Sequence, residues 1–200
     1  MKKLLFVLFI SASAIFSSYA QSSEEINKST NWTWFGIDYT NCYYIMSYDF
    51  PSVSDLESKI VAWNNLVLTE REKFLVKPFK GKTIAYSIDM VSALNEGIDV
   101  KSRISNDGML SSHIEKSQIQ EIVNNYQIPD DLSGIGLIFI AESYNKPNEK
   151  GAYYVTFFDI ESKKVLSTER KLGKASGFGL RNYWANSYYV ILKELGKTYK

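Results

Sequence analysis

The most regular hydrophobic pattern of the chain lies toward its C-terminal end. Residues 152–160 and 165–172 are rich in β-branched and aromatic side chains, and the polar segment 161–164 joins them, which predicts two antiparallel strands and a tight turn. A glycine-bearing linker, 173–179, follows. Beyond it the pattern predicts a helix that covers the sheet and ends at a Gly196 C-cap. The apolar positions on one face of this helix are Leu180, Trp184, Tyr188, Ile191 and Leu195.

Three more strands are predicted earlier in the chain. Residues 32–45 are aromatic and β-branched, with an interruption expected near Asn41, and residues 83–89 follow a Lys-Gly-Lys turn. Residues 134–142 form a nearly continuous apolar run, which is typical of a central strand buried on both faces. The predicted sheet therefore has five strands.

Two helices are predicted between these strands. The first begins at a capping box at residues 54–57, or at the overlapping box 52–55, and its apolar positions continue to about Lys73. The second begins at another capping box, residues 112–115. The intervening segment 91–110 contains two glycines and two asparagines and is predicted to be a long loop, with a short element around Ile98 to Ile104 as an alternative.

The predicted order of elements is β-α-β-α-β-β-β-α, which gives a single α/β (α+β) domain over residues 32–200. Strands separated by helices are joined by right-handed crossovers, so the first three strands are expected to be parallel neighbours or near neighbours. The last two add an antiparallel hairpin. The result is a mixed-sheet sandwich of two or three layers. The 45% hydrophobic and 22% charged composition is ordinary for one soluble domain.

The first twenty residues have the pattern of a signal peptide. Two lysines precede a short apolar run, and small residues lead to an exit at Ala20. A transmembrane helix is the alternative, but the run is shorter than the ~20 residues that span a bilayer and is interrupted by serines. Residues 1–20 are therefore predicted to be cleaved and residues 21–31 to form a flexible N-terminal arm. The mature protein is expected to be periplasmic or secreted, without a transmembrane helix.

Charge and cysteine content argue against several classes of partner. The signal segment carries two of the 23 basic residues and none of the 22 acidic ones, so the mature chain has a net charge of −1 and no electrostatic reason to bind nucleic acid. The residue after the expected cleavage point is Gln21, not the cysteine of a bacterial lipoprotein, which argues against a lipid anchor. The only cysteine, Cys42, is expected to be a small buried hydrophobe, and no internal disulfide can form.

The C-terminal unit resembles a known group of envelope proteins. Asp159 ends a strand, a Glu-Ser-Lys-Lys turn follows, and a strand through Leu166 leads to the linker and the amphipathic helix. Over residues 134–195 this arrangement resembles the α/β domains of curli-secretion lipoproteins and of penicillin-binding-protein activator lipoproteins. The chain is also similar to uncharacterised secreted proteins of Gram-negative bacteria. The resemblance implies a protein-binding domain without enzymatic activity, and since the lipidation cysteine is missing, membrane anchoring is not implied.

Three acidic residues follow apolar runs at the ends of predicted strands: Asp38, Asp89 and Glu142. In a parallel sheet their carboxylates would lie at one edge, where open α/β folds bind ligands. Such a group could hold a divalent cation through oxygen ligands or act as an acid/base pair. The alternative is that these strands exit into solvated acidic loops. No resident metal or other cofactor is predicted.

A second candidate site is the glycine-rich segment that runs from Lys174 to Arg181. Glycines let the backbone approach a ligand, and a helix N-terminus offers free amides to an anion. The segment lacks the full dinucleotide and phosphate-loop fingerprints. Arg181 opposes the dipole of the predicted helix, so pairing with a surface acid such as Glu169 is the alternative interpretation.

Aromatic residues make up 14% of the chain and supply a third candidate surface. Exposed rings could stack on sugars or form a protein-binding patch, although most are expected in the core. The only histidine, His113, has no ligand neighbours at metal-site spacing and lies far from Cys42, so neither a metal site nor a catalytic thiol is predicted. The aromatic candidates are Tyr43, Tyr44, Tyr153, Tyr183, Tyr188 and Tyr189.

The sequence therefore favours a non-enzymatic periplasmic or envelope-associated domain that binds a protein partner. It contains a signal pattern, no nucleophile beside a base, and the architecture of a binding module. The alternative is a binder of a small molecule or glycan, or a hydrolase that uses Asp38, Asp89 and Glu142.

Overall fold

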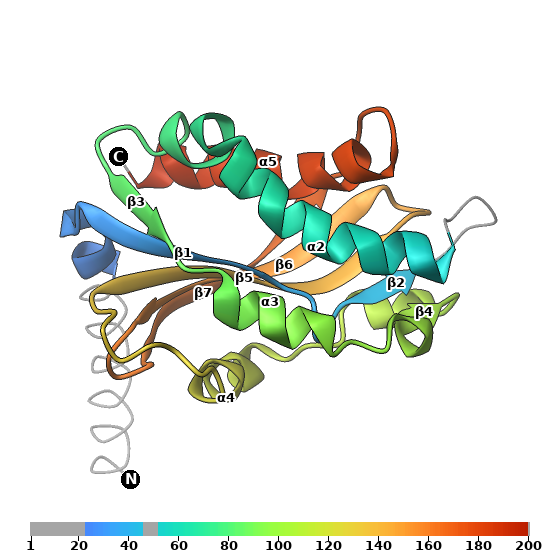
Figure 1. Cartoon of the computed structure of the whole chain (residues 1–200), viewed down its shortest axis with the longest axis horizontal. Coiled ribbons are helices and arrows are strands. Elements are labelled where there is room, and N and C mark those ends of the chain that lie inside the picture. The colour runs from blue at the N-terminus through green and yellow to red at the C-terminus, as the bar shows by residue number, and fades with distance from the viewer. Residues whose placement is uncertain (1–22, 46–51, 200) are drawn as a thin grey trace, which may run out of the picture.

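A seven-stranded mixed sheet runs through the structure, with helices on both of its faces (Figure 1). A computed structural model describes residues 23–45 and 52–199. A helix over residues 23–28 precedes the first strand. The elements that follow are β1 (Asn31–Asp38), β2 (Tyr43–Ile45), α2 (Val53–Thr69), η1 (Glu72–Val76), β3 (Thr83–Tyr86), α3 (Asp89–Glu96), η2 (Val100–Arg103), β4 (Ile104–Ser105), η3 (Gly108–Ser111), η4 (Lys116–Gln118), α4 (Ile119–Asn124), β5 (Ile135–Asn145), β6 (Lys150–Asp159), β7 (Val165–Lys174) and α5 (Leu180–Thr198).

The central strand of the sheet is β5. One edge of β5 pairs in parallel with β1 along its first half and with β2 near its end. The other edge pairs antiparallel with β6, which pairs in turn with β7. The short strands β3 and β4 lie beyond β1 and β2, and both are parallel to their neighbours. The α/β class, the parallel first strands and the antiparallel hairpin are therefore confirmed.

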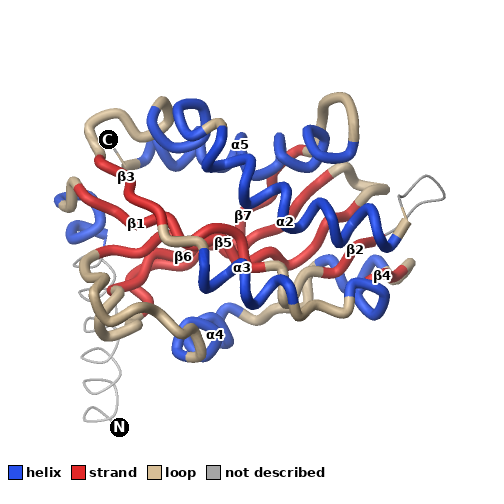
Figure 2. The backbone as a smooth tube through the Cα atoms, in the orientation of Figure 1, coloured by secondary structure: helices blue, strands red, loops and turns tan. Residues whose placement is uncertain are grey.

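The helices form two layers, one on each face of the sheet (Figures 1 and 2). On the first face α2 and α5 pack over a large core that contains all four tryptophans of the chain. On the second face α3 and α4 pack over a smaller core of aliphatic and aromatic side chains. All eleven residues of β5 are buried as a result, as expected for a strand with an unbroken apolar run.

Two predictions for the middle of the chain are wrong. Segment 91–110, expected to be a loop, begins inside helix α3, which spans only eight residues and so shows too few turns of apolar periodicity to be recognised. The short element expected as an alternative around Ile98 to Ile104 is present as η2 and β4. The helix expected from Ser112 begins at Ile119 instead, after a separate 3-10 turn. The interruption expected near Asn41 is confirmed as a turn between β1 and β2. At the start of α2 the capping box 52–55 forms, the second of the two alternatives.

The structure describes only part of the N-terminal region for which predictions were made. The predicted signal peptide, residues 1–20, lies outside the described residues. Residues 23–28, part of the expected flexible arm, form a helix whose Ile26 is fully buried, because its side chain joins the first core. Among the helices that the structure describes, none is long and apolar enough to cross a membrane.

A chain of buried hydroxyl groups crosses the first core. The hydroxyls of Tyr39 and Tyr144 lie 2.9 Å apart, and Tyr153 donates to Tyr144 over 3.0 Å. The Ser187 hydroxyl lies 2.6 Å from that of Tyr153. Burial raises the pKa of each of the three tyrosines above its usual value. The hydroxyls therefore stay protonated at neutral pH and satisfy one another inside an apolar layer.

Two asparagine side chains complete the outer edge of β1. β3 pairs with β1 only as far as Trp34, so the next backbone groups of β1 need other partners. The carboxamide of Asn64 in α2 accepts from the Ile37 amide over 2.7 Å and donates to the Ile37 carbonyl over 2.9 Å. Asn95 of α3 accepts from the Tyr39 amide over 2.8 Å. Both asparagines are buried and take the place of a neighbouring strand.

Replacing Asn64 by aspartate tests this role. A carboxylate cannot donate to the Ile37 carbonyl, and the change places a charge at a buried position. We expect Asn64→Asp to lower the free energy of unfolding in urea by about 3 kcal/mol. Asn65→Asp, at the exposed neighbouring position of the same helix, is the control and is expected to change it by less than about 0.5 kcal/mol. Equal losses in the two variants would contradict the assignment.

Gly196 lies inside α5 and not at its C-cap, which corrects the prediction from sequence. The helix passes so close to the chain before β3 that a Cβ on Gly196 would lie 2.0 Å from the Pro78 carbonyl oxygen. A real Cβ does not approach a backbone atom so closely. Glycine is therefore required at position 196 by close packing against Pro78, and not by the end of the helix.

Gly196→Ala separates packing from helix propensity. In an open helix this change would stabilise by up to about 1 kcal/mol, whereas the clash with Pro78 is expected to cost about 2 kcal/mol or more. We expect the Tm of Gly196→Ala to fall in thermal denaturation. The control is Gly97→Ala, where the nearest atom is the Leu94 carbonyl oxygen at 3.6 Å, and its Tm should stay within about 2 °C of the parent. A higher Tm for Gly196→Ala would show that no such contact exists.

Candidate functional site

Three strands contain a β-bulge, and the bulges determine which side chains point to the second face of the sheet. The extra residues are Phe35 in β1, Glu142 in β5 and Leu166 in β7. Because side chains alternate along a strand, one extra residue turns those after it to the opposite face. The polar residues at the end of β5 and in the second half of β7 thereby come together on the second face.

Glu142 is a fully buried carboxylate in the central strand. Its Oε1 accepts from the amides of His113 and Ile114, each over 2.9 Å, and its Oε2 accepts from Arg170 Nε over 2.6 Å. Arg170 also donates from Nη2 to the Ser111 carbonyl over 2.7 Å. Burying a carboxylate is costly unless it is paired and hydrogen-bonded, and these donors meet that condition. They also tie β7 and the loop before α4 to the end of β5.

A cavity of about 260 Å³ opens beside this ion pair. Its floor comes from three adjacent strands, because Ser143, Ala152 and Leu172 stand opposite one another in register. Leu172 is 50% exposed, which leaves the floor accessible to a partner. The other lining residues are Ser111, Asn145, Asn148, Lys150 and Arg170.

Lys150 and Lys174 stand directly opposite each other at the ends of β6 and β7. Both are exposed, and like charges that face each other across a strand pair destabilise it. Within the described ranges neither lysine has an ion-pair partner, whereas the charge of Arg170 is offset by Glu142. We call the cavity together with Lys150, Arg170 and Lys174 the cationic corner. It carries two positive charges that the fold itself does not offset.

Asp38 lies at the end of β1, and its carboxylate is used inside the fold. Oδ1 accepts from the amide and the hydroxyl of Thr40 over 2.8 and 2.6 Å, and Oδ2 accepts from the Tyr126 hydroxyl over 2.7 Å. Burial, and after it the neighbouring Asp38 carboxylate, raise the pKa of Tyr126 well above its usual value. Asp38 therefore fixes the turn after β1 and the end of the α4 segment.

Of the three acids expected at strand ends, only Asp38 ends a strand, because Glu142 lies inside β5 and Asp89 belongs to α3. β3 ends at Tyr86, and Asp89 is the exposed first residue of α3, where its charge suits the helix dipole. Asp38 and Glu142 are buried and held by protein donors. In the part of the chain that the structure describes, no group of three or more His, Cys, Asp or Glu side chains could hold a metal ion.

The glycine-rich linker separates its two predicted site residues. Lys174 ends β7 and belongs to the cationic corner. Arg181 is exposed in the first turn of α5, and its Nε donates to Asn182 over 3.2 Å. Glu169, the alternative partner for Arg181, pairs with Lys171 over 3.0 Å instead. Of the two residues predicted for this site, only Lys174 belongs to the candidate site.

None of the remaining candidates from the sequence lines the cavity. Burial raises the pKa of the Cys42 thiol, which leaves it protonated and unreactive at neutral pH. Nδ1 of His113 lies 2.9 Å from the Leu110 carbonyl oxygen. Three of the six tyrosine candidates are buried, and the other three are partly exposed. The buried ones are Tyr44, Tyr153 and Tyr188, and the others are Tyr43, Tyr183 and Tyr189.

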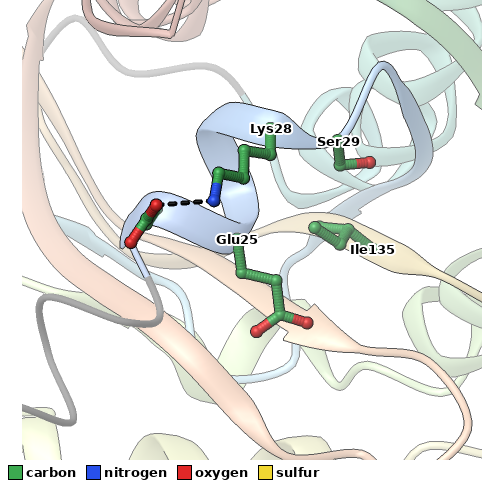
Figure 3. A pocket seen from close by; sticks show the side chains of 5 residues that line it. Glu25, Lys28, Ser29 and Ile135 are labelled. Carbon is green, nitrogen blue, oxygen red and sulfur yellow. Dashed lines mark ion pairs between the residues drawn. The ribbon is translucent and has the colours of Figure 1, made fainter.

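A second, wider hollow of about 660 Å³ lies beside the N-terminal helix (Figure 3). Its Glu24–Lys28 ion pair, with a 2.6 Å separation, joins two largely exposed side chains, and such pairs contribute little to stability. Glu25 points away from that pair. Glu24, Glu25 and Lys28 are exposed and no buried polar side chain among the described residues lines the hollow, so it is not the candidate site. Its lining residues are Glu24, Glu25, Lys28, Ser29 and Ile135.

No family model matches the chain, and no significant match exists among curated proteins or solved structures. The resemblance of residues 134–195 to envelope lipoproteins therefore stays a prediction. The fold class rests on the structure itself, and the site rests on its own geometry.

Arg170 and Lys150 were not recognised from the sequence. Arg170 faces the second face only because Leu166 is bulged, and bulges leave no clear mark in one sequence. One signal was available. An acid inside a continuous apolar strand, such as Glu142, requires a buried cationic or amide partner, and β7 contains an arginine at a polar position.

Glu142→Gln tests whether the buried ion pair holds this corner together. Glutamine has a single side-chain oxygen, so it cannot accept from the two backbone amides and from Arg170 at once. We expect the free energy of unfolding to fall by about 2–3 kcal/mol, since Arg170 is partly exposed and can recover some hydration. Glu161→Gln, at the exposed β6–β7 turn, is the matched control and should stay within about 0.5 kcal/mol of the parent. A loss under about 1 kcal/mol for Glu142→Gln would mean that the pair is dispensable.

Proposed function

We propose that the chain is a non-enzymatic domain of the bacterial cell envelope that binds a partner protein at the cationic corner. The observation that carries the proposal is the open cavity on the second face, where an arginine fixed by a buried carboxylate stands beside an exposed leucine. Protein-binding surfaces are enriched in arginine and methionine. Met109, two residues before the lining residue Ser111, is 81% exposed.

The size of the cavity favours a partner side chain over a free small molecule or glycan. Sites for drug-sized ligands usually enclose ~300–1,000 Å³, and this cavity has about 260 Å³. One or two side chains of a docked protein would fill it. Exposed apolar groups around a polar centre then supply contact area beyond the cavity itself.

The burial of the strand-end acids favours binding over hydrolysis. Asp38 and Glu142 accept hydrogen bonds from protein donors, and neither lines the cavity. Asp89, the exposed first residue of α3, does not line it either. The location in the envelope rests on the signal pattern of residues 1–20 and on the resemblance of residues 134–195, both of which are sequence arguments.

Site-specific photocrosslinking in a Gram-negative host tests the proposal. A photoreactive p-benzoylphenylalanine replaces Leu172 in one strain and Val61 in another, because both side chains are 50% exposed and they lie on β7 and on α2. We expect a discrete protein adduct from position 172 and none from position 61. Adducts of equal yield at both positions, or none at either, would reject a partner at the cationic corner.

A further inference from the structure

The guanidinium of Arg170 is fixed in orientation yet only partly used. Its Nε donates to Glu142 and one Nη2 hydrogen donates to the Ser111 carbonyl. A guanidinium has five N–H donors, so three of them, including both on Nη1, have no acceptor among residues 23–45 and 52–199. An arginine held this way loses little side-chain entropy when it binds an anion.

The cavity contains a second donor that the fold leaves available. Asn145 is only 5% exposed, and its Oδ1 accepts from the Asn148 amide over 2.9 Å. Its Nδ2 has no acceptor within the described part of the chain, and Asn145 lines the cavity. By contrast the Ser143 hydroxyl donates to the Ser111 carbonyl over 3.0 Å, so it is already used. Nearly buried polar groups are normally hydrogen-bonded, and this amide donor, open to the cavity, is available to an acceptor that comes from outside.

We propose that the cationic corner binds the carboxylate of an acidic side chain, presented by a peptide segment of the partner; this rests on the proposed function. The carboxylate accepts two hydrogen bonds from the free guanidinium edge of Arg170, the geometry that planar arginine provides. The Asn145 amide supplies a further donor. Lys150 and Lys174 attract the acidic segment from the rim, where water and salt screen them.

The apolar part of the floor distinguishes this ligand from a free inorganic anion. Ala152 and Leu172 lie beside the polar donors, and the methylene groups of a glutamate side chain would pack against them. Inorganic phosphate has no apolar part for this surface. A neutral glycan would bring hydroxyl groups and no charge to match the two uncompensated lysines.

A titration of the mature protein followed by NMR of its backbone amides tests the proposal with defined probes. The probes are the capped peptide Ac-Ala-Ala-Glu-Ala-NH2, the same peptide with Gln for Glu, the free acid Ac-Ala-Ala-Ala-Ala-OH, and sodium phosphate. We expect the Glu peptide to shift amides around Asn145, Asn148 and Ala152, with at least about a tenfold lower Kd than the Gln peptide. Equal binding of the Glu and Gln peptides overturns the proposal. Preferential binding of phosphate or of the C-terminal carboxylate overturns the assignment to a side chain.

Charge variants connect the binding to these residues. The double variant Lys150→Gln with Lys174→Gln changes only exposed positions. We expect it to raise the Kd of the Glu peptide about fivefold or more at low salt. Lys77→Gln with Lys80→Gln, exposed near η1, is the matched control and should leave the Kd unchanged. Arg170→Lys keeps a cation for Glu142 but loses the planar donors, so a loss of about tenfold is expected. If Arg170→Lys does not fold, the double lysine variant still tests the proposal, because an unchanged Kd of the Glu peptide for that variant would contradict it.

The two proposals fail separately. Binding of the Glu peptide without a crosslinked partner at position 172 would retain the carboxylate site and reject the protein-binding function. A crosslinked partner at position 172 without any amide shift from the Glu peptide would retain the protein-binding function and reject the carboxylate site.

Discussion

The central strand β5 has no face open to water, and this constraint determines much of the second face. All eleven of its residues are buried, so a charged side chain there needs hydrogen-bond partners within the protein. Its one charged residue, Glu142, finds them in two backbone amides of the loop before α4 and in Arg170 of β7. A single buried carboxylate thus connects the central strand, an outer strand and the connection that leads to α4.

The same ion pair explains why a binding surface occurs at this corner. Arg170 is held by its inner edge, which leaves its outer donors beside a cavity, and the register of β6 with β7 adds Lys150 and Lys174 at the strand ends. Facing lysines lower stability slightly. Positions that disfavour folding are retained most readily where they serve binding, and here they lie next to an exposed Leu172.

Long, regular patterns allowed most of the fold to be predicted, but not the faces of its strands. The β6–β7 hairpin, β5 and the apolar face of α5 repeat over enough residues to be read directly. If the register is continued without a bulge from the pair Phe158–Val165, Arg170 stands opposite Tyr153 and faces the first core. The bulge at Leu166 places it opposite Tyr154, on the second face. Contacts between distant segments, such as Asn64 with Ile37, also leave no local signal in the sequence.

A double-mutant cycle between Glu142 and Arg170 is the most direct test of this account. The free energies of unfolding of the parent, Glu142→Gln, Arg170→Met and the double variant give the coupling between the two side chains. The structure predicts a coupling of about 2 kcal/mol or more. Each single change leaves the other side chain charged, buried or partly buried, and without the opposite charge that it pairs with. Additive losses, within about 0.5 kcal/mol, would show that the carboxylate and the guanidinium do not depend on each other, and the cationic corner would then have no fixed centre.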